Sequence, residues 1–336
     1  MVVAEDPLTV EVEGERRAAW ADTELLGEMR EGDEVVVNVA ALDLGLGSGG
    51  FDVVHVNLTR GLEGAGAGSE HVMKLNYTSL QHPVEPVERA LGTEGQTPAP
   101  VLVLPLHGHL APAAWAAAQT VPGLRLGYVQ TGGGALPGSL SRDVAELRER
   151  GLLCGHITAA PAYGGEHEAV SVAGALDAAA QRLGWEAVIA GPGPGIIGSE
   201  TRLGHGGIAA LDTAHAALAL GMPTLLSPRL SAADPRERHR GVSHHTLTVL
   251  QLLLAPVEVP IPSPGAASAA QLAETTARLA TAAGRRHKLR EAPADLAGYA
   301  TSGLPAHTMG RDIPDDPLFY AAALSAGHYL GLSLAS

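Results

Sequence analysis

The stretch VLVLPL, residues 101–106, decides the fold class of this chain. It is a short and uninterrupted apolar run, which is the pattern of a strand buried on both of its faces. An Ala-rich segment of helical length follows it, and then come the strand-like LRLGYVQ (124–130) and the helical pattern of LSRDVAELRERG (140–151). Strands that alternate with helices of ten or more residues are typical of βαβ units, so we expect a parallel sheet.

The same alternation continues toward the C-terminus. The predicted strands are LLCGHITAA (152–160), EAVIAG (186–191), PTLLSPR (223–229) and PVEVPIP (256–262). The predicted helices between them cover residues 166–184, 207–221 and 244–254. We therefore predict an α/β fold with a doubly wound, mostly parallel, Rossmann-like sheet over residues 98–336.

Residues 1–97 have a different pattern and are predicted to form a small β domain, either a barrel or a meander, with a linker. Short Val-rich segments alternate there with glycine-rich turns, as in EGDEVVVN (31–38), FDVVHVNL (51–58) and EHVMKLNY (70–77). The stretch 79–100 is rich in Pro, Gly, Thr and Glu and is interpreted as the linker between the two domains.

The amino-acid composition limits which binding partners and which cellular compartment we expect for this protein. The net charge is −14 and no basic run occurs, so a phosphate-contact surface for nucleic acid is not expected. The single cysteine, Cys154, rules out an internal disulfide and fits a reducing compartment. We find neither a basic, apolar leader pattern nor an 18-residue apolar run, and we expect a cytoplasmic protein with no membrane partner. The Ala-rich helices could form the face of a homodimer.

The loops that follow the predicted strands carry most of the polar chemistry. In a doubly wound sheet, ligands bind in a crevice outside the carboxyl ends of the strands. Long polar loops occupy only this edge of the predicted sheet, and the helix-to-strand connections at the other edge are short. The histidines in or beside these loops are His107, His109, His167, His205, His239, His244 and His245.

Two of these loops, TGGGALP (131–137) and the one that begins GPGPG (191–195), are rich in glycine and lead into helices. Backbone N–H groups at a helix N-terminus favour anions, so we predict that these loops bind a small anionic molecule. Neither loop is a nucleotide fingerprint. The predicted substrate-binding residues outside the arginine loop are Thr131, Gly132, Gly133, Gly134, Gly164, Gly165, Gly193, Gly195, Ser199 and Thr201.

The loop SAADPRERHRGVSHHTLTVL (231–250) is the densest polar passage in the chain. One or two of its arginines, Arg236, Arg238 and Arg240, could clamp a carboxylate or phosphate. Asp234 could instead pair with one of them as a structural brace. Ser243 stands where a helix N-cap is expected, and it is also counted among the substrate-binding residues.

Proton transfer is the chemistry that this loop most favours. The candidate catalytic residues are His239, His244, His245, Asp234 and Glu166. Adjacent His244 and His245 point about 100° apart on a helix, so one can face a substrate while the other packs. The cofactor stays open: a divalent metal would need a further ligand, and the candidates are His239, His107, His109, Glu166 and Glu168, with none of the familiar metal-ligand spacings.

The passages GGALP (133–137), GPGIIG (193–198) and DPRERHRGVSHHT (234–246) resemble those of a bacterial family classified only as a domain of unknown function. The resemblance covers most of the chain and includes TMGR (308–311). It implies a shared architecture and no established reaction. The chain departs from the family pattern at Thr131, where an acidic residue often precedes the glycines, and at Glu166, where Asp is usual. It also has GSET (198–201) in place of a Gly-Thr-Gly-Thr-like run and GHGG (204–207) in place of a GFSG-like run.

These patterns lead to one functional hypothesis and one alternative. The leading hypothesis is an enzyme, a hydrolase or transferase, that acts on a small anionic substrate with His, Asp or Glu as acid and base. The alternative is a non-catalytic ligand-binding or assembly protein that uses the same crevice for a nucleotide-like ligand.

Overall fold

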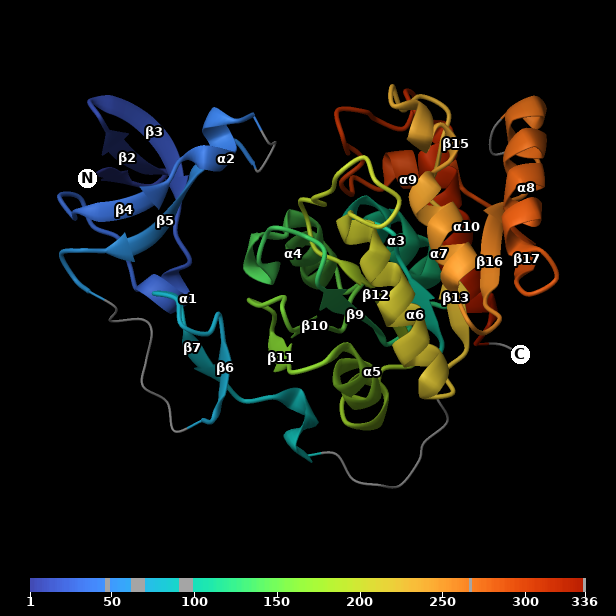
Figure 1. The fold of residues 1–336 in the computed structure, drawn as a ribbon, viewed down its shortest axis with the longest axis horizontal. Helices are drawn as coiled ribbons and strands as arrows, with labels where there is room; N and C mark the ends of the chain where they lie inside the picture. Colours follow the sequence, from blue (N-terminus) through green and yellow to red (C-terminus); the bar gives the residue numbers. More distant parts are fainter. Residues whose placement is uncertain (46–48, 62–69, 91–98, 266–267, 335–336) are drawn as a thin grey trace. The chain divides into compact units, whose positions relative to one another are not determined.

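The computed structural model describes residues 1–45, 49–61, 70–90, 99–265 and 268–334. The chain divides into two compact units, Met1–Pro86 and Val87–Ser336 (Figure 1). The boundary that we predicted at 97/98 lies outside the described residues. The first part of the predicted linker contains a strand, β7 (His82–Val84), and a short 3-10 helix, η1 (Val87–Ala90).

The N-terminal unit is built on a five-stranded sheet in the order β1-β2-β3-β5-β4. Its core includes the buried side chains of Val2, Val10, Leu26 and Val54. The described strands form an open, curled sheet, because β1 and β4 are its two edges and do not pair with each other, so the barrel alternative does not describe them. Its elements are β1 (Val2–Glu5), β2 (Leu8–Val12), β3 (Glu15–Trp20), α1 (Thr23–Leu26), β4 (Val35–Asn38), α2 (Ala40–Asp43), β5 (Asp52–Asn57) and the hairpin of β6 (Val72–Lys74) with β7.

The second unit contains an eight-stranded sheet in the order β11-β10-β9-β12-β8-β13-β16-β17. Every pairing in it is parallel, which confirms the predicted parallel α/β class. The strands are β8 (Val101–Val103), β9 (Leu126–Thr131), β10 (Gly155–Ala159), β11 (His167–Ala169), β12 (Ala187–Pro192), β13 (Thr224–Leu226), β16 (Glu258–Pro262) and β17 (Lys288–Ala292).

Helices cover both faces of this sheet, and the strand side chains alternate between the two cores. Val101 and Val103 of β8 belong to the core beneath α5, α6, α7 and α8, whereas Leu102 belongs to the core beneath α3, α4, α9 and α10. The uninterrupted apolar run of the first strand therefore reflects burial on both faces. The helices are α3 (Leu110–Thr120), α4 (Arg142–Glu149), α5 (Val172–Gln181), α6 (Ala209–Ala219), α7 (His244–Leu252), α8 (Ala269–Ala283), α9 (Leu296–Thr301) and α10 (Pro317–Leu332).

One predicted helix is shorter than expected. We predicted a helix over 166–184, but α5 begins only at Val172, after Ser171, whose hydroxyl accepts a hydrogen bond from the Gly174 N–H. The residues before it form β11, which pairs with β10 at the edge of the sheet. The N-cap at Ser171 and the pairing of β11 therefore divide the predicted helix into a strand and a shorter helix. The apolar pattern of the sequence does not mark the boundary between them.

The strand order creates a topological switch point between β8 and β12. From β8 the chain moves across β12 to β9, and from β12 it returns in the opposite direction across β8 to β13. Ligands of doubly wound sheets bind where the direction reverses, beside the carboxyl ends of the two strands. Among the helices that the structure describes, none is both long enough and apolar enough to cross a membrane.

Candidate metal centre

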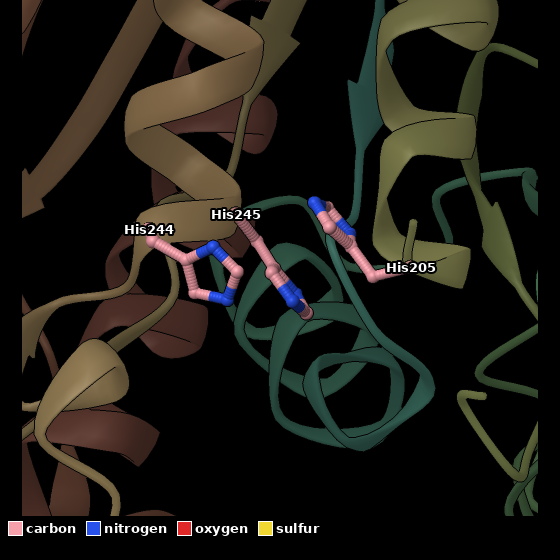
Figure 2. Close-up of side chains that lie close together, drawn as sticks. All are labelled: His205, His244 and His245. Atoms are coloured by element: carbon pink, nitrogen blue, oxygen red, sulfur yellow. The ribbon is translucent and has the colours of Figure 1, made fainter. Parts of the chain in front are cut away.

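Four histidines converge on the segments that follow β12 and β13. His205 precedes the short η4 helix (Gly206–Ile208) at the start of α6, and His239 lies in η5 (Glu237–His239). His244 and His245 form the first turn of α7. Figure 2 shows that His205 approaches the other two labelled rings from a different segment of the chain. Residues from two strand-end loops therefore share one cluster.

The rings are in direct contact. His205 stacks on His245 with centroids 3.6 Å apart and planes 5° from parallel. The ring of His239 lies 5.0 Å from that of His244 and 4.9 Å from that of His245. One ring nitrogen each from His205, His244 and His245 lies within 4.8 Å of the others. We call His205, His239, His244 and His245 the histidine cluster.

Hydrogen bonds define which nitrogens of the cluster are available. The Arg202 carbonyl accepts a hydrogen bond from Nε2 of His205 at 3.0 Å, so Nδ1 of that ring carries the lone pair. This Nδ1 is buried and has no hydrogen-bond partner among the described residues. The same is true of Nε2 of His244 and Nδ1 of His245. An unsatisfied buried polar atom costs about 1–3 kcal/mol, so three on neighbouring rings require an explanation.

The cluster is uncharged at neutral pH. Burial is the largest cause that lowers the pKa of all four histidines, and the positive charge of Arg229 adds to it. The pKa falls to about 3 for His239 and to about 2 for His245. A neutral imidazole offers a lone pair, which is the form that binds metal ions.

Glycines bring the segments close enough to form the cluster. A Cβ atom on Gly207 would lie 2.9 Å from Nδ1 of His245 and 3.3 Å from Nδ1 of His205. A Cβ atom on Gly206 would collide with the carbonyl oxygen of Gly133, in the loop after β9. The Gly-Gly pair after His205 therefore allows close backbone approach at the point where two strand-end loops meet.

Ser243 connects two members of the cluster. It is the N-cap of α7, and its hydroxyl accepts a hydrogen bond from the His245 N–H at 3.2 Å. The same hydroxyl is hydrogen-bonded to Nδ1 of His239 at 2.8 Å. Such second contacts orient a ring and fix its tautomer, so Ser243 orients His239 while it begins the helix that carries His244 and His245.

His205, His244 and His245 are the residue types of a catalytic zinc site in which three histidines leave a further position open. In a tetrahedral zinc site the ligand nitrogens are about 3.3 Å apart. One ring nitrogen from each of His205, His244 and His245 lies within 4.8 Å of the other two. Because imidazole lone pairs lie in the ring plane, the stacked His205 and His245 rings must rotate toward a shared ion. The residue types, burial and free nitrogens fit a metal ion of the kind that imidazole prefers, such as zinc.

Asp234 is bonded to arginines, and no hydrogen bond from a histidine ring to its carboxylate is found among the described residues. Its carboxylate, which is fully buried, accepts hydrogen bonds from Arg229 at 3.1 Å, Arg236 at 2.9 Å and Arg311 at 3.4 Å. Burial opposes ionisation, but the hydrogen bonds from Arg236 and the nearby charge of Arg229 hold the pKa of this carboxyl well below its usual range. The bracing role that the sequence left open is the one that the geometry favours.

The other two predicted arginines of the loop are bonded to partners outside the histidine rings. Arg238 pairs with the exposed carboxylate of Glu200 at 2.9 Å. Arg240 donates to the Asp234 carbonyl at 3.5 Å. Glu166, predicted as an acid or base, pairs with Arg148 of α4 at 2.8 Å. The alternating arginines of this loop thus have different partners.

The predicted glycine loops mainly contact one another. Gly134 packs against the Gly193 carbonyl, and the Ala135 N–H donates to the Gly195 carbonyl at 3.0 Å. A Cβ atom on Gly132 would meet the ring of Pro161 at 2.9 Å. These glycines allow the neighbouring loops to pack closely against each other.

Other donors and hydroxyls in the predicted anion loops also have internal partners. The Gly164 and Gly165 N–H groups both donate to the Glu168 carboxylate, at 2.7 and 3.3 Å. Ser199 and Thr201 bond to each other at 2.7 Å and close the loop that ends at His205. The Thr131 hydroxyl, buried at the end of β9, donates to the Gly132 carbonyl.

Sequence reasoning did not select His205 as the third ligand. Two of the residues that the sequence suggested as a further metal ligand have other partners. His107 is bonded through Nε2 to Ser141 at 2.8 Å, and His109 is bonded through Nδ1 to Ser227 at 2.9 Å. The signal that could have identified His205 is its position in HGG (205–207), directly before a helix and after the strand that lies at the switch point.

Comparison with known proteins places the chain in a family. No curated protein matches it. A family model described as "Protein of unknown function (DUF3866)" matches residues 18–327, which include most of each unit and the whole histidine cluster. The resemblance inferred from the sequence motifs is thereby confirmed. The chain belongs to the DUF3866 family of proteins of unknown function.

Proposed function

We propose that this protein is a metal-dependent hydrolase that acts on a small anionic substrate. The observation that carries the proposal is the presence of three buried ring nitrogens without partners on His205, His244 and His245. Three neutral imidazoles with an open fourth position are the ligand set of many catalytic zinc sites. The position of His205 at the switch point between β8 and β12 adds support, because that is where doubly wound sheets bind ligands.

The ion would lower the pKa of a water molecule and polarise the substrate. The chain's own residues would supply the rest. His205, His244 and His245 hold the ion, and Ser243 orients His239 beside them. As the water oxygen bonds to the electrophilic carbon or phosphorus, the neutral His239 ring would relay the water proton without holding it, because burial lowers the pKa of that ring to about 3. The bond to the leaving group then breaks and the leaving atom takes up that proton, so one water molecule is consumed.

Metal content and turnover measured together test the proposal. The wild-type chain is expected to bind one zinc ion, and His205→Asn, His244→Asn and His245→Asn are each expected to lower zinc affinity at least 100-fold. A matched control is His215→Asn on α6, since the half-buried His215 ring accepts from the Leu254 N–H and lies outside the cluster. Equal zinc binding by all four variants would refute the proposed site.

A panel of small phosphate and carboxylate esters separates the enzyme from the alternative. Hydrolysis that requires zinc and is lost in His244→Asn supports the proposal. If an anionic ligand binds the zinc form but is recovered chemically unchanged, the protein is a ligand-binding protein, the alternative considered above.

A further inference from the structure

A group of charged side chains lies next to the uncharged histidine cluster. Arg229, Arg236 and Arg311 all donate to the carboxylate of Asp234, and Arg311 also forms an ion pair with Asp316, whose carboxylate lies 3.3 Å from Nε. Counted over these described residues, the network contains three guanidinium groups and only two carboxylates. We call Arg229, Arg236 and Arg311 the arginine cluster. Its three positive charges exceed the two negative charges of Asp234 and Asp316 by one.

The excess charge is partly removed from water. Arg229 is only 3% exposed, and its Nε–H is buried with no hydrogen-bond partner among the described residues. Burial lowers the pKa of this guanidinium to about 10, which leaves it charged at neutral pH. A buried charge without full compensation is strongly unfavourable, so the arginine cluster is suited to receive an additional anion.

A tight turn from a distant part of the chain completes this cluster. The backbone groups of Thr308 and Arg311 exchange two hydrogen bonds of 3.0 Å, with Met309 and Gly310 at the turn in positive-φ conformations. The turn places the Met309 sulfur 3.4 Å from Nη2 of Arg229. The TMGR motif therefore delivers a third guanidinium group to the loop after β13.

The arginine cluster is joined to the histidine cluster through the backbone. The Ser243 N–H donates to the Arg229 carbonyl at 3.0 Å, and the Arg229 N–H donates to the Thr246 hydroxyl at 2.9 Å. These two contacts flank His244 and His245 at the start of α7. Arg236, whose side chain is 42% exposed, gives solvent access to the arginine cluster.

We propose that Arg229, Arg236 and Arg311 form a subsite for a phosphate group, which makes the substrate a small phosphorylated molecule. This inference rests on the proposed function for the site of reaction. Guanidinium groups match the oxygens of phosphate in a bidentate geometry. One excess charge from the arginines and two from a bound divalent ion favour a dianion over a monocarboxylate.

Calorimetric titration with inorganic phosphate tests the subsite. Phosphate is expected to bind the zinc-loaded wild-type chain, and Arg236→Gln and Arg311→Gln are each expected to raise the dissociation constant about tenfold or more without changing zinc stoichiometry. The matched control is Arg290→Gln: its side chain is 40% exposed, similar to that of Arg236, and it pairs with Glu258 at the outer edge of the sheet. This control should bind phosphate normally.

The titration is repeated on His244→Asn, which is expected to lack zinc, so that the arginine cluster is assayed separately from the metal. Weaker phosphate binding that still depends on Arg236 supports the subsite even if the metal proposal fails. Acetate at the same concentration should bind more weakly than phosphate. Unchanged phosphate affinity in both Arg236→Gln and Arg311→Gln, or equal binding of acetate and phosphate, would overturn the inference.

Discussion

The imidazole of His205 stacks on that of His245 with 3.6 Å between ring centroids, although the two residues follow different strands of the sheet. Their contact depends on the strand order, because β12 and β13 flank β8 on opposite sides. Both rings are neutral and both present a buried nitrogen without a partner. The pair is therefore the structural centre of the proposed metal site.

Ser243→Ala should affect both stability and metal affinity. Loss of an N-cap costs about 1 kcal/mol, and here the bond to Nδ1 of His239 is lost as well. Chemical denaturation and zinc titration of the same variant measure the two effects. Ser171→Ala, which removes the N-cap of α5, is the matched control. It should lose similar stability and keep its zinc affinity, and an equal loss of affinity in both variants would contradict an orienting role for Ser243.

Gly207→Ala should weaken zinc binding more than it weakens folding. The added methyl group would lie 2.9 Å from Nδ1 of His245 and 3.2 Å from the Pro105 carbonyl oxygen, so one ring must move. We expect zinc affinity to fall at least tenfold while the circular dichroism spectrum stays that of the wild type. Wild-type zinc affinity in this variant would show that Nδ1 of His205 and Nδ1 of His245 do not face a shared ion.

Asp234→Asn should be among the most destabilising single substitutions in the second unit. It removes the charge that Arg229, Arg236 and Arg311 share in a buried position, and breaking a buried pair typically costs about 3–5 kcal/mol. Glu258→Gln, which loses a partly exposed pair with Arg290, should cost no more than about 1 kcal/mol. Denaturant midpoints that are equal for the two variants would contradict the bracing role of Asp234.

The stability of the N-terminal unit should fall in acid through Asp33. A hydrogen bond from Arg60 at 2.9 Å lowers the pKa of the Asp33 carboxyl to about 2. A depressed carboxyl pKa contributes stability above the unfolded value of about 4, and the contribution is lost as pH falls from about 4 toward 2. Asp33→Asn should be less stable at pH 7 and show a smaller loss over this range. A pH profile identical to that of the wild type would exclude this role.

Local patterns predicted the parts of the fold that depend on neighbouring residues. The apolar run at 101–106 and the alternation after it indicated the parallel sheet, and the serine before His244 and His245 indicated the start of α7. The helix predicted over 166–184 was too long because its boundary depends on Ser171 and on the edge pairing of β11. Spacing alone does not reveal either feature.

The candidate site was harder to predict than the fold, because contacts between residues far apart in the sequence bring its side chains together. His205 becomes a ligand candidate only because β12 lies beside β8, and a strand order of this kind is not visible in local pattern. Arg311 reaches Asp234 from the C-terminal part of the chain and joins Arg229 and Arg236 at its carboxylate, and these contacts favour the bracing role. The glycines were recognised as important, but the structure assigns them to close packing between loops.

X-ray absorption spectroscopy of the zinc-loaded chain identifies the ligands of the bound ion. We expect one zinc ion with about three imidazole nitrogens at about 2.0–2.1 Å, and loss of that spectrum in His205→Asn and His244→Asn. A protein that binds no zinc, or zinc bound without imidazole ligands, would contradict the proposed centre.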